Sequence, residues 1–410
     1  MAEPRSALDG AADADVIVIG AGIIGACIAY TLRRRGADVL LIEADEPGRG
    51  CSYGNSGALS TASLAPLAMP GIVSALPRML LDPDAPLKLD PAYLPRALPW
   101  LLQFAASATR ARAERAAHAL QALHAGAVEA HVALAREIGA PELILQRGQL
   151  HLYPDETAFG KDRAAWELRA RHGVRYQLLE RNGILELEPR IGARYRCGVL
   201  IPDQATVVNP FRYVRRLVAA FVQDGGRLVR DRVRLRRDRA ALHCDGVQRY
   251  SAAHIVVAAG IESRALLHNV DVRVPLISQR GYHVMFRDVA NAVSRSVVLA
   301  DRKVFLTPME EGLRVGGTVE IAAPSRAPDE RRWDRLADFA REALGDLPGR
   351  IDRWMGNRPC TPTSLPIIGG CESLPSLWLA IGHGHLGLTQ SVATAQRIAE
   401  DLLPLRQSAR

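Results

Sequence analysis

Residues 15–43, with the sequence DVIVIGAGIIGACIAYTLRRRGADVLLIE, decide the fold of this chain. Residues 16–19 are an apolar, β-branched run, which is typical of a strand buried on both faces. The following residues place apolar side chains at helical intervals and end in three arginines, which suit the last turn of a helix. Residues 39–42 predict a second strand that ends at Glu43. The stretch therefore predicts a strand, a helix and a second strand.

Three glycines join the first strand to the helix at GxGxxG spacing, namely Gly20, Gly22 and Gly25. The first permits a tight turn, the second lets the backbone approach a pyrophosphate, and the third lets helix and strand pack closely. The helix begins near Ile23, and its first N–H groups attract an anion. Glu43 can bind ribose hydroxyls and would repel a 2′-phosphate, which argues against NADP. A dinucleotide is the predicted ligand, and a plain glycine-rich turn is the alternative.

The whole chain has an ordinary globular composition, with 410 residues of which 48% are hydrophobic and 23% charged. This length allows two domains or one large α/β body with an inserted layer. The net charge of +8 comes from arginines spread along the chain, and aromatic residues make up only 5%. Nucleic-acid binding is therefore not predicted, whereas attraction to anionic lipid or anionic substrates stays open.

Cysteine and histidine spacing predicts neither a disulfide framework nor a metal site. The six cysteines form no CxxC pair. His118, His124 and His131 lie at intervals of six and seven residues rather than as an i, i+4 pair, so we interpret them as surface or packing residues.

Membrane insertion is not predicted. Residues 1–13 lack the charged start and apolar core of a signal peptide, which favours the cytosol. Residues 51–77 carry no charge but are too rich in Ser, Gly and Pro for a spanning helix. Residues 97–109 are apolar but short, and a packed helix is favoured over docking on a bilayer. We expect a cytoplasmic protein, with peripheral contact to the inner face of the cell membrane as the alternative.

Residues 46–71 are rich in small and hydroxyl side chains and show no apolar periodicity. A loop of this length beside the ribose-binding acid can fold along a cofactor and offer N–H groups to phosphates and a flavin ring. The residues that we expect at such contacts are Ser52, Asn55, Ser56 and Gly57. A plain surface loop is the alternative.

The middle of the chain alternates between predicted helices and predicted strands. The expected elements are helix 91–139, strand 149–153, helix 162–172, short β pieces 198–202 and 203–208, helix 211–223, strand 227–234 and strand 254–258. Because this half repeats the order of strand, helix and strand seen at the N-terminus, the sequence predicts one parallel sheet assembled from separated segments.

Beyond residue 274 the pattern changes to alternation. The expected elements are antiparallel strands at 277–286, 297–300, 304–308 and 313–320, then a helix at 331–344. A sheet with one face covered by a helix would be a substrate platform. Alternation lets only one of Tyr282 and His283 face a cavity; we expect Tyr282 there, with a core tyrosine as the alternative. A strand at 377–381, a glycine-rich turn at 382–389 and a helix to about residue 403 end the chain.

Several of these pieces together resemble the D-amino acid oxidase and dehydrogenase family of FAD enzymes. They are the fingerprint with Glu43, the NSG loop at 55–57, the VVAAG run ending at Gly260, the RPxTPxxxPIIG stretch from Arg358 and the turn before the last helix. The resemblance covers nearly the whole chain and is nearest to bacterial D-amino acid dehydrogenases. The runs RGYH (280–283) and GHGHLG (382–387) are similar to members that act on D-proline or 4-hydroxy-D-proline.

The resemblance implies an α/β fold with two domains. A Rossmann-like FAD-binding domain is expected from the separated segments 14–80, 197–275 and 355–405. An antiparallel-sheet substrate-binding domain is expected from 81–196 and 276–354.

The resemblance also implies roles for single residues. Arg358 stands where the family's arginine holds the substrate carboxylate, and a structural salt bridge is the alternative. The expected FAD contacts in the second half of the chain are Val233, Gly260, Gly384, Leu386, Gly387, Leu388 and Thr389. Glycine oxidases carry an arginine where His385 stands, which leaves His385 for a substrate hydroxyl or ring amine; His383 is interpreted as structural. Covalent attachment of the flavin at Cys360 is not expected, because the position at which family members tether the flavin corresponds to Arg358 in this sequence.

The implied activity is an FAD-dependent dehydrogenase that oxidises a D-amino acid, in particular a cyclic one, to an imine by hydride transfer to flavin N5. The expected electron acceptor is a quinone or a partner flavoprotein. One alternative is a sarcosine- or glycine-type amine oxidase that uses oxygen. Another is a flavin- or NAD-binding subunit or sensor without turnover.

Overall fold

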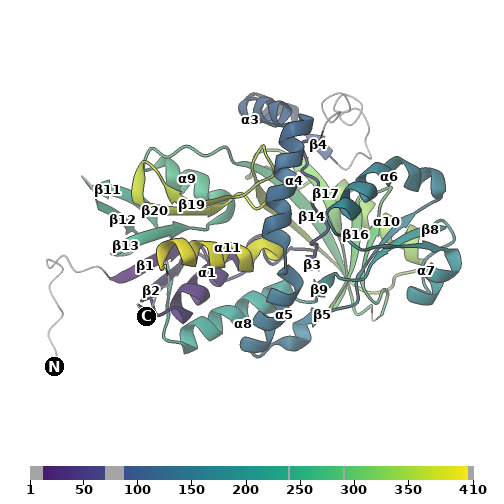
Figure 1. Ribbon diagram of the computed structural model, residues 1–410, viewed down its shortest axis with the longest axis horizontal. Helices are drawn as coiled ribbons and strands as arrows, with labels where there is room; N and C mark the ends of the chain where they lie inside the picture. The colour runs from purple at the N-terminus through teal and green to yellow at the C-terminus, as the bar shows by residue number, and fades with distance from the viewer. Residues whose placement is uncertain (1–12, 70–86, 239–240, 290, 405–410) are drawn as a thin grey trace.

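The computed structural model describes residues 13–69, 87–238, 241–289 and 291–404. Figure 1 shows two large sheets, one in the left half of the molecule and one in the right half, with helices packed around each. The expected loose lead at 1–13 lies outside the described residues except for Asp13, and so does the end of the 46–71 loop. No helix within the described ranges is long and apolar enough to cross a membrane.

The first sheet has a parallel core in the order β10-β2-β1-β13-β20. The core strands are β1 (Ala14–Ile19), β2 (Val39–Glu43), β10 (Arg227–Arg230), β13 (Arg249–Val257) and β20 (Leu374–Ile381). Antiparallel strands extend it, namely β11 (Arg234–Asp238), β12 (Ala241–Asp245) and β19 (Ile367–Cys371). The predicted parallel sheet built from separated segments is confirmed.

The single strand expected over 227–234 is wrong, because two strands, β10 and β11, occupy this stretch. The chain turns where the Asp231 N–H donates to the Glu43 carbonyl oxygen at 2.9 Å. The Asp231 carboxylate in turn accepts the Tyr250 hydroxyl at 2.9 Å. Val233 consequently lies between the two strands and borders the cavity described below.

Four helices pack with β1 and β2 in one apolar core. They are α1 (Ile23–Arg34), α5 (Ala127–Glu137), α8 (Pro210–Gln223) and α11 (Gly387–Leu402). The start of α8 follows from its sequence, because Pro210 fits the first helical position and the Asn209 side chain accepts the Arg212 N–H at 2.9 Å. Helices α1 and α11 lie side by side, so the first and last helices of the chain are neighbours in this core (Figure 1).

The helical stretch expected over 91–139 is interrupted twice. It consists of η1 (Pro91–Tyr93), α3 (Leu94–Ser107), α4 (Arg110–His124) and α5. Thr109 caps α4 by accepting the Arg112 N–H at 3.4 Å. Gly126 takes a left-handed φ of 65° before α5, a conformation that favours glycine.

The second sheet carries the expected antiparallel strands in the order β14-β17-β16-β15 and continues from β15 into β6-β8-β7. It also contains β18, a strand that the sequence did not predict, paired with β14. The strands are β4 (Leu87–Leu89), β6 (Gln149–Tyr153), β7 (Gln177–Glu180), β8 (Cys197–Ile201), β14 (Ile277–Arg287), β15 (Ser296–Leu299), β16 (Val304–Met309), β17 (Gly312–Ile321) and β18 (Ile351–Cys360). Two contacts are parallel, β15 with β6 and β17 with β4. Helix α10 (Glu330–Leu344) covers one face, and its apolar residues join Val284, Phe286 and Val315 in a second core.

The remaining elements are short or peripheral. A three-stranded sheet consists of β3 (Ala58–Leu59), β9 (Ala205–Val207) and β5 (Ile144–Leu145), and the other helices are η2 (Pro141–Leu143), α6 (Glu156–Arg171), α7 (Arg181–Leu187), η3 (Gly260–Glu262) and α9 (Ser263–His268). The residue ranges of the two domains remain a prediction. The strand pairings show that β8 and β18 belong to the second sheet.

Gly25 carries the contact between α1 and β1, and its replacement tests that contact. A Cβ at Gly25 would lie 1.8 Å from the Gly20 carbonyl oxygen, which is backbone and has no room to move. We expect Gly25→Ala to lower the free energy of unfolding by about 3 kcal/mol or more in denaturant titrations. The control is Gly160→Ala in α6, where a Cβ meets nothing within 4 Å. Gly160→Ala should raise the free energy of unfolding by up to about 1 kcal/mol. Equal effects of the two substitutions would contradict a close contact at Gly25.

Candidate active site

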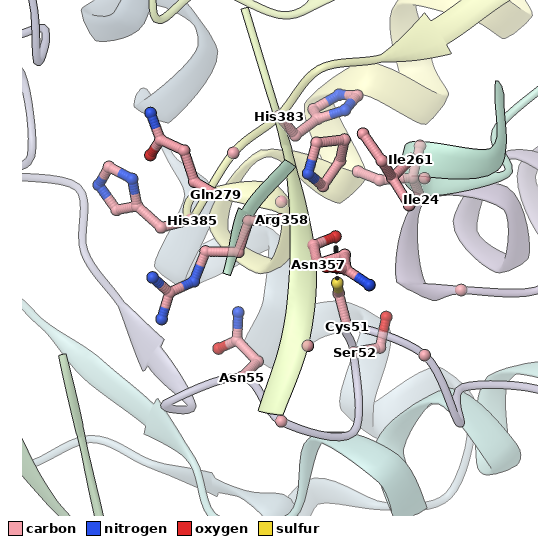
Figure 2. Close-up of a pocket in the computed structure, with 18 of the residues that line it drawn as sticks. Ile24, Cys51, Ser52, Asn55, Ile261, Gln279, Asn357, Arg358, His383 and His385 are labelled. Atoms are coloured by element: carbon pink, nitrogen blue, oxygen red, sulfur yellow. Dashed lines mark hydrogen bonds between the residues drawn. The ribbon is translucent and has the colours of Figure 1, made fainter. Parts of the chain in front are cut away.

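One cavity of about 1640 Å³ lies between the two sheets. Its lining starts at the carboxyl ends of β1, β2 and β13, follows the 46–60 loop and ends between β14, β17, β18 and α3. We call the part around Gly22 and Glu43 the dinucleotide end and the part around Arg358 the substrate end. Figure 2 shows residues from both ends, brought together by segments far apart in the sequence.

The dinucleotide end is built as the fingerprint predicts. Gly20 adopts a φ of 103°, and a Cβ there would lie 2.7 Å from the Ala258 carbonyl oxygen, so only glycine fits this turn. The Glu43 carboxylate accepts the Ala21 N–H at 2.6 Å at the end of β2. The Ser52 hydroxyl accepts the Ile23 N–H at 2.9 Å, which ties the following loop to the first turn of α1.

Two helix N-termini open into this one cavity. Helix α1 starts after Gly22 and α11 starts after Leu386, and neither cap residue makes a side-chain hydrogen bond to its helix. Gly22, Ile23, Leu386 and Leu388 all line the cavity. The Ile23 N–H is already donated to Ser52, so the groups available to negative charge, at two separate places, are the remaining first-turn N–H groups and the positive dipole ends of the two helices.

The cavity fits FAD on this evidence. The N-terminus of α1 suits the pyrophosphate, and Glu43 suits the ribose. A Cβ at Gly260 would meet nothing within 4 Å, so the wall beside it is bare backbone facing open space. The N-terminus of α11 would favour negative charge on a reduced flavin ring.

Most of the predicted cofactor residues line the cavity. Those that do are Gly20, Gly22, Ile23, Glu43, Ser52, Asn55, Ser56, Val233, Gly260, Gly384, Leu386, Gly387 and Leu388. Three do not border it. Gly25 is used for packing against Gly20, the Gly57 N–H donates to Asn55 Oδ1 at 2.8 Å, and Thr389 Oγ1 accepts the Ser60 N–H at 3.1 Å.

Arg358 occupies the substrate end with most of its hydrogen-bonding capacity unused. It lies on β18 opposite Gln279 of β14. The bare Gly281 makes room for it, since a Cβ there would lie 2.2 Å from the guanidinium carbon. Its Nη1 donates to the Thr318 carbonyl oxygen at 3.3 Å, and among the described residues it forms no ion pair. Burial lowers the pKa of Arg358, as expected for a buried cation that lacks a carboxylate partner.

Tyr282 and His283 both border the cavity, but the structure corrects the expectation that the Tyr282 side chain faces it. Tyr282 donates its hydroxyl to Glu320 at 2.6 Å and packs its ring on Trp333 of α10, so its side chain lies on the helix-covered face. By alternation His283 shares the opposite face with Gln279. His283 stacks on Trp354 with ring centroids 5.0 Å apart, and burial lowers its pKa well below the usual value.

The two histidines of the turn differ in their surroundings. His383 is buried, and its Nε2 lies 3.0 Å from Thr394 Oγ1, which agrees with a structural role. His385 exposes its side chain into the cavity beside Arg358 (Figure 2). Burial within the protein lowers the pKa of His385 to about 4, with Arg358 as a further cause. The His385 imidazole is therefore neutral at physiological pH.

Two buried histidines, His124 and His131, pack beneath this turn. His131 Nε2 donates to the Leu388 carbonyl oxygen at 2.8 Å, and its Nδ1 accepts the Tyr213 hydroxyl at 3.0 Å. His124 lies 3.0 Å from the Gln390 side chain. The interpretation of these histidines as packing residues agrees with their burial, but their support of the start of α11 could not be predicted from their spacing.

Sequence reasoning missed three parts of the site. Arg314 of β17 donates to the carbonyl oxygens of Tyr53 and Asn55 and so holds the loop in place. Gln279 faces the cavity beside Arg358. The inner face of α3 supplies the apolar wall of the substrate end through Trp100 and Phe104. Arg314 could have been noticed as a charged residue within the alternating pattern of 313–320. The contributions of Gln279 and of α3 depend on strand pairing and helix packing, which the sequence does not show.

Cys360 is a small buried residue, as expected. It is 4% exposed, and burial raises the pKa of its thiol to about 12, so a reactive thiolate is not formed there. Its carbonyl oxygen accepts the Trp100 indole N–H at 3.1 Å, which fixes the α3 wall to β18.

Comparison with known proteins agrees with this geometry. The fold and the cavity define a flavin-dependent oxidoreductase, and residues 15–401 match the DAO family, described as FAD dependent oxidoreductase. The chain belongs to this family. It is 36% identical over 396 residues to a D-amino-acid oxidase of Bradyrhizobium diazoefficiens, covering 94% of each chain. It is 32% identical to D-amino acid dehydrogenase 2 of Ralstonia nicotianae, covering 96% of this chain and 97% of that protein.

Solved structures share the fold. The glycine oxidase of Geobacillus kaustophilus superposes with a TM-score of 0.73 at 21% identity, covering 95% of this chain and 94% of that one. The L-proline dehydrogenase of P. horikoshii gives a TM-score of 0.71 at 17% identity, covering 95% and 93%. The protein is accordingly an FAD-dependent enzyme of the D-amino acid oxidase and dehydrogenase type.

Buried neutral histidines make this protein sensitive to acid. Burial lowers the pKa of His131 to about 4 from its ordinary value of 6.5. Between these values the unfolded chain binds a proton that the folded chain does not, so the free energy of unfolding falls as pH drops through this window. We expect His131→Gln to flatten that slope by up to about 1.4 kcal/mol per pH unit in denaturant titrations at several pH values.

Exposed His118 of α4 provides the control for this measurement. His118→Gln should leave the slope as it is in the wild type. An identical slope in the wild type and in His131→Gln would contradict the buried neutral state of His131.

Proposed function

We propose that this protein is a dehydrogenase that oxidises a D-amino acid to an imine, with D-proline or 4-hydroxy-D-proline as the favoured substrate. FAD supplies the hydride acceptor when it is bound. The observation that carries the proposal is a half-buried arginine, Arg358, without an acidic partner in the described residues, at the apolar end of a cavity that begins at a dinucleotide fingerprint.

Arg358 binds and orients the substrate carboxylate. Its planar guanidinium offers paired N–H donors to a planar anion, and burial strengthens the attraction. Gln279 lies opposite in register and presents an amide on the same face. Gly281 leaves the guanidinium accessible, because any side chain there would overlap it. Two residues thus fix the carboxylate, and with it the position of the α-carbon.

The substrate amine is held in its neutral form. The carboxylates that line the cavity all lie toward the dinucleotide end, namely Glu43, Asp45, Glu46, Asp231 and Glu262. Among the described residues no acid therefore stabilises an ammonium ion at the substrate end. His385, neutral because its pKa is about 4, can accept a hydrogen bond from a ring amine or meet a substrate hydroxyl. A neutral amine is what hydride loss from the α-carbon requires.

The wall around this point favours an uncharged ring as the substrate side chain. Trp100 and Phe104 of α3 pack in one apolar cluster with Ile321 of β17, and these three residues and Val319 line the cavity. These apolar side chains exclude water and suit a pyrrolidine ring better than a charged side chain. His385 is the polar group available to a 4-hydroxyl.

We further propose a quinone or a partner flavoprotein as electron acceptor, and peripheral contact of the enzyme with the inner face of the cell membrane. The relatives are named both oxidase and dehydrogenase, so their names leave the acceptor open. The exposed apolar face of α3 supports a peripheral location.

An anaerobic titration tests the reaction and the substrate. We expect D-proline or 4-hydroxy-D-proline to bleach the flavin absorbance of the purified holoenzyme, because both place an amine and a carboxylate at one carbon of a small ring. The L-enantiomers and glycine serve as controls and should leave the colour in place. Bleaching by sarcosine, with rapid peroxide formation in air, would instead support the alternative function of a sarcosine-type amine oxidase that uses oxygen.

Replacement of Arg358 tests its role in binding. We expect Arg358→Ala to keep its flavin colour and to lose about a hundredfold to several thousandfold in kcat/KM, since removing one partner of a buried charge pair costs about 3–5 kcal/mol. The control is Arg353→Ala on the same strand, whose guanidinium is 43% exposed and paired with Asp334 at 2.7 Å. Unchanged kcat/KM in Arg358→Ala would remove Arg358 from the site.

A further inference from the structure

Helix α3 (Leu94–Ser107) is apolar on two opposite faces. Its inner face carries Trp100 and Phe104, which line the cavity. Its outer face carries Leu94, Leu98 and Leu102, which are 41%, 48% and 63% exposed. Figure 1 shows α3 at the upper edge of the molecule, beside β4 and above α4.

The outer face of α3 is unusual within this structure. Its three exposed leucines are spaced four residues apart, so they form one stripe along the helix. No other described helix or strand carries more than one large apolar side chain that is equally exposed. A contiguous apolar stripe on a surface marks an interaction site, because single exposed leucines are common and aligned ones are not.

Positively charged residues predominate in the sequence around this stripe. The cations in and around α3 are Lys88, Arg96, Arg110, Arg112 and Arg115, whereas the acids are Asp90 and Glu114. Asp90 is paired with Arg326 and Glu114 with Arg110, so neither acid offsets the remaining cations. The Arg112 guanidinium donates to the Ala106 carbonyl oxygen at 2.6 Å, which places a cation at the end of the stripe.

The dimensions and charges of this face argue against a membrane-spanning helix and against a second copy of this chain. A helix of 14 residues is about 21 Å long and cannot span a bilayer, which needs about 20 residues. A second copy docked on the stripe would bring like charges together around Arg96. One helix face would also supply only a fraction of the roughly 800 Å² per partner that a stable dimer buries.

We propose that the outer face of α3 docks this protein on an anionic lipid bilayer, with the helix lying in the plane of the interface. The leucines enter the boundary between headgroups and acyl chains, and the flanking arginines meet anionic headgroups. Leu94 lies in the stripe and also lines the cavity, so docking brings the mouth of the cavity to the bilayer surface. This deepens the peripheral location proposed above, and it depends on neither the substrate nor the chemistry.

Vesicle sedimentation of the purified holoenzyme tests the docking surface without any substrate. We expect the wild type to bind phosphatidylcholine vesicles that contain about a quarter phosphatidylglycerol, and binding to fall steeply between about 50 mM and 500 mM salt. The double variant Leu98→Glu with Leu102→Glu should lose about tenfold or more in partitioning. Neither leucine lines the cavity, so flavin content and substrate bleaching should match the wild type.

The matched control carries the same change at Leu178 and Val247, which are 58% and 93% exposed on other elements. It should bind vesicles like the wild type. Equal binding by both double variants, or no binding by the wild type, would overturn the proposal. A wild-type dimer in light scattering that the α3 variant abolishes, with no vesicle binding, would show that a second copy covers the stripe. Failure to bleach with any D-amino acid would overturn the proposed function and leave the docking result standing.

Discussion

The close approach of helix α1 to strand β1 is the constraint on which the rest of the structure depends. Gly25 lets the helix backbone reach the Gly20 carbonyl oxygen, so α1 starts directly at the carboxyl end of the central strand. Helix α11 packs beside α1, and its N-terminus opens on the same cavity. Two helix dipoles from opposite ends of the chain thus point their positive ends at one elongated ligand.

A second constraint concerns buried charge. Arg280 on β14 is fully buried, and it is paired with Glu320 at 3.3 Å on the face covered by α10. Arg358 on the neighbouring strand is half-buried and has no carboxylate partner within the described ranges. A buried cation without a partner is costly to keep, and a bound carboxylate relieves that cost. The buried arginine on the α10 face is thus paired within the protein, whereas Arg358 on the cavity face is left for a ligand.

Helix α3 links the site to the surface. Its inner side chains close the substrate end, and the Trp100 indole N–H holds it to β18 at the Cys360 carbonyl oxygen. Its outer leucines face solvent. Because one helix provides both the cavity wall and the proposed docking face, contact with a bilayer would bring the mouth of the cavity, at Leu94, to the lipid.

The amino-acid sequence by itself determined the elements whose signals are local. Apolar runs, glycine spacing and alternation gave the parallel sheet, the turn before α1 and the antiparallel strands, because these depend on the period of the backbone. The resemblance to a known family added Arg358 and the turn before α11, and both line the cavity that the structure shows. The family and its cofactor are confirmed by comparison.

Only the tertiary structure decided what depends on partners distant in sequence. Alternation showed that the side chains of Tyr282 and His283 lie on opposite faces of the sheet. Which of the two lies on the helix-covered face was decided by the contacts of Tyr282 with Glu320 and with Trp333 of α10. The stretch expected as one strand over 227–234 is divided between two partners, because β10 pairs with β2, far away in the chain, and β11 pairs with β12. The physical reason is that a backbone pattern repeats within a few residues, whereas packing and charge pairing depend on which surfaces the folded chain brings together.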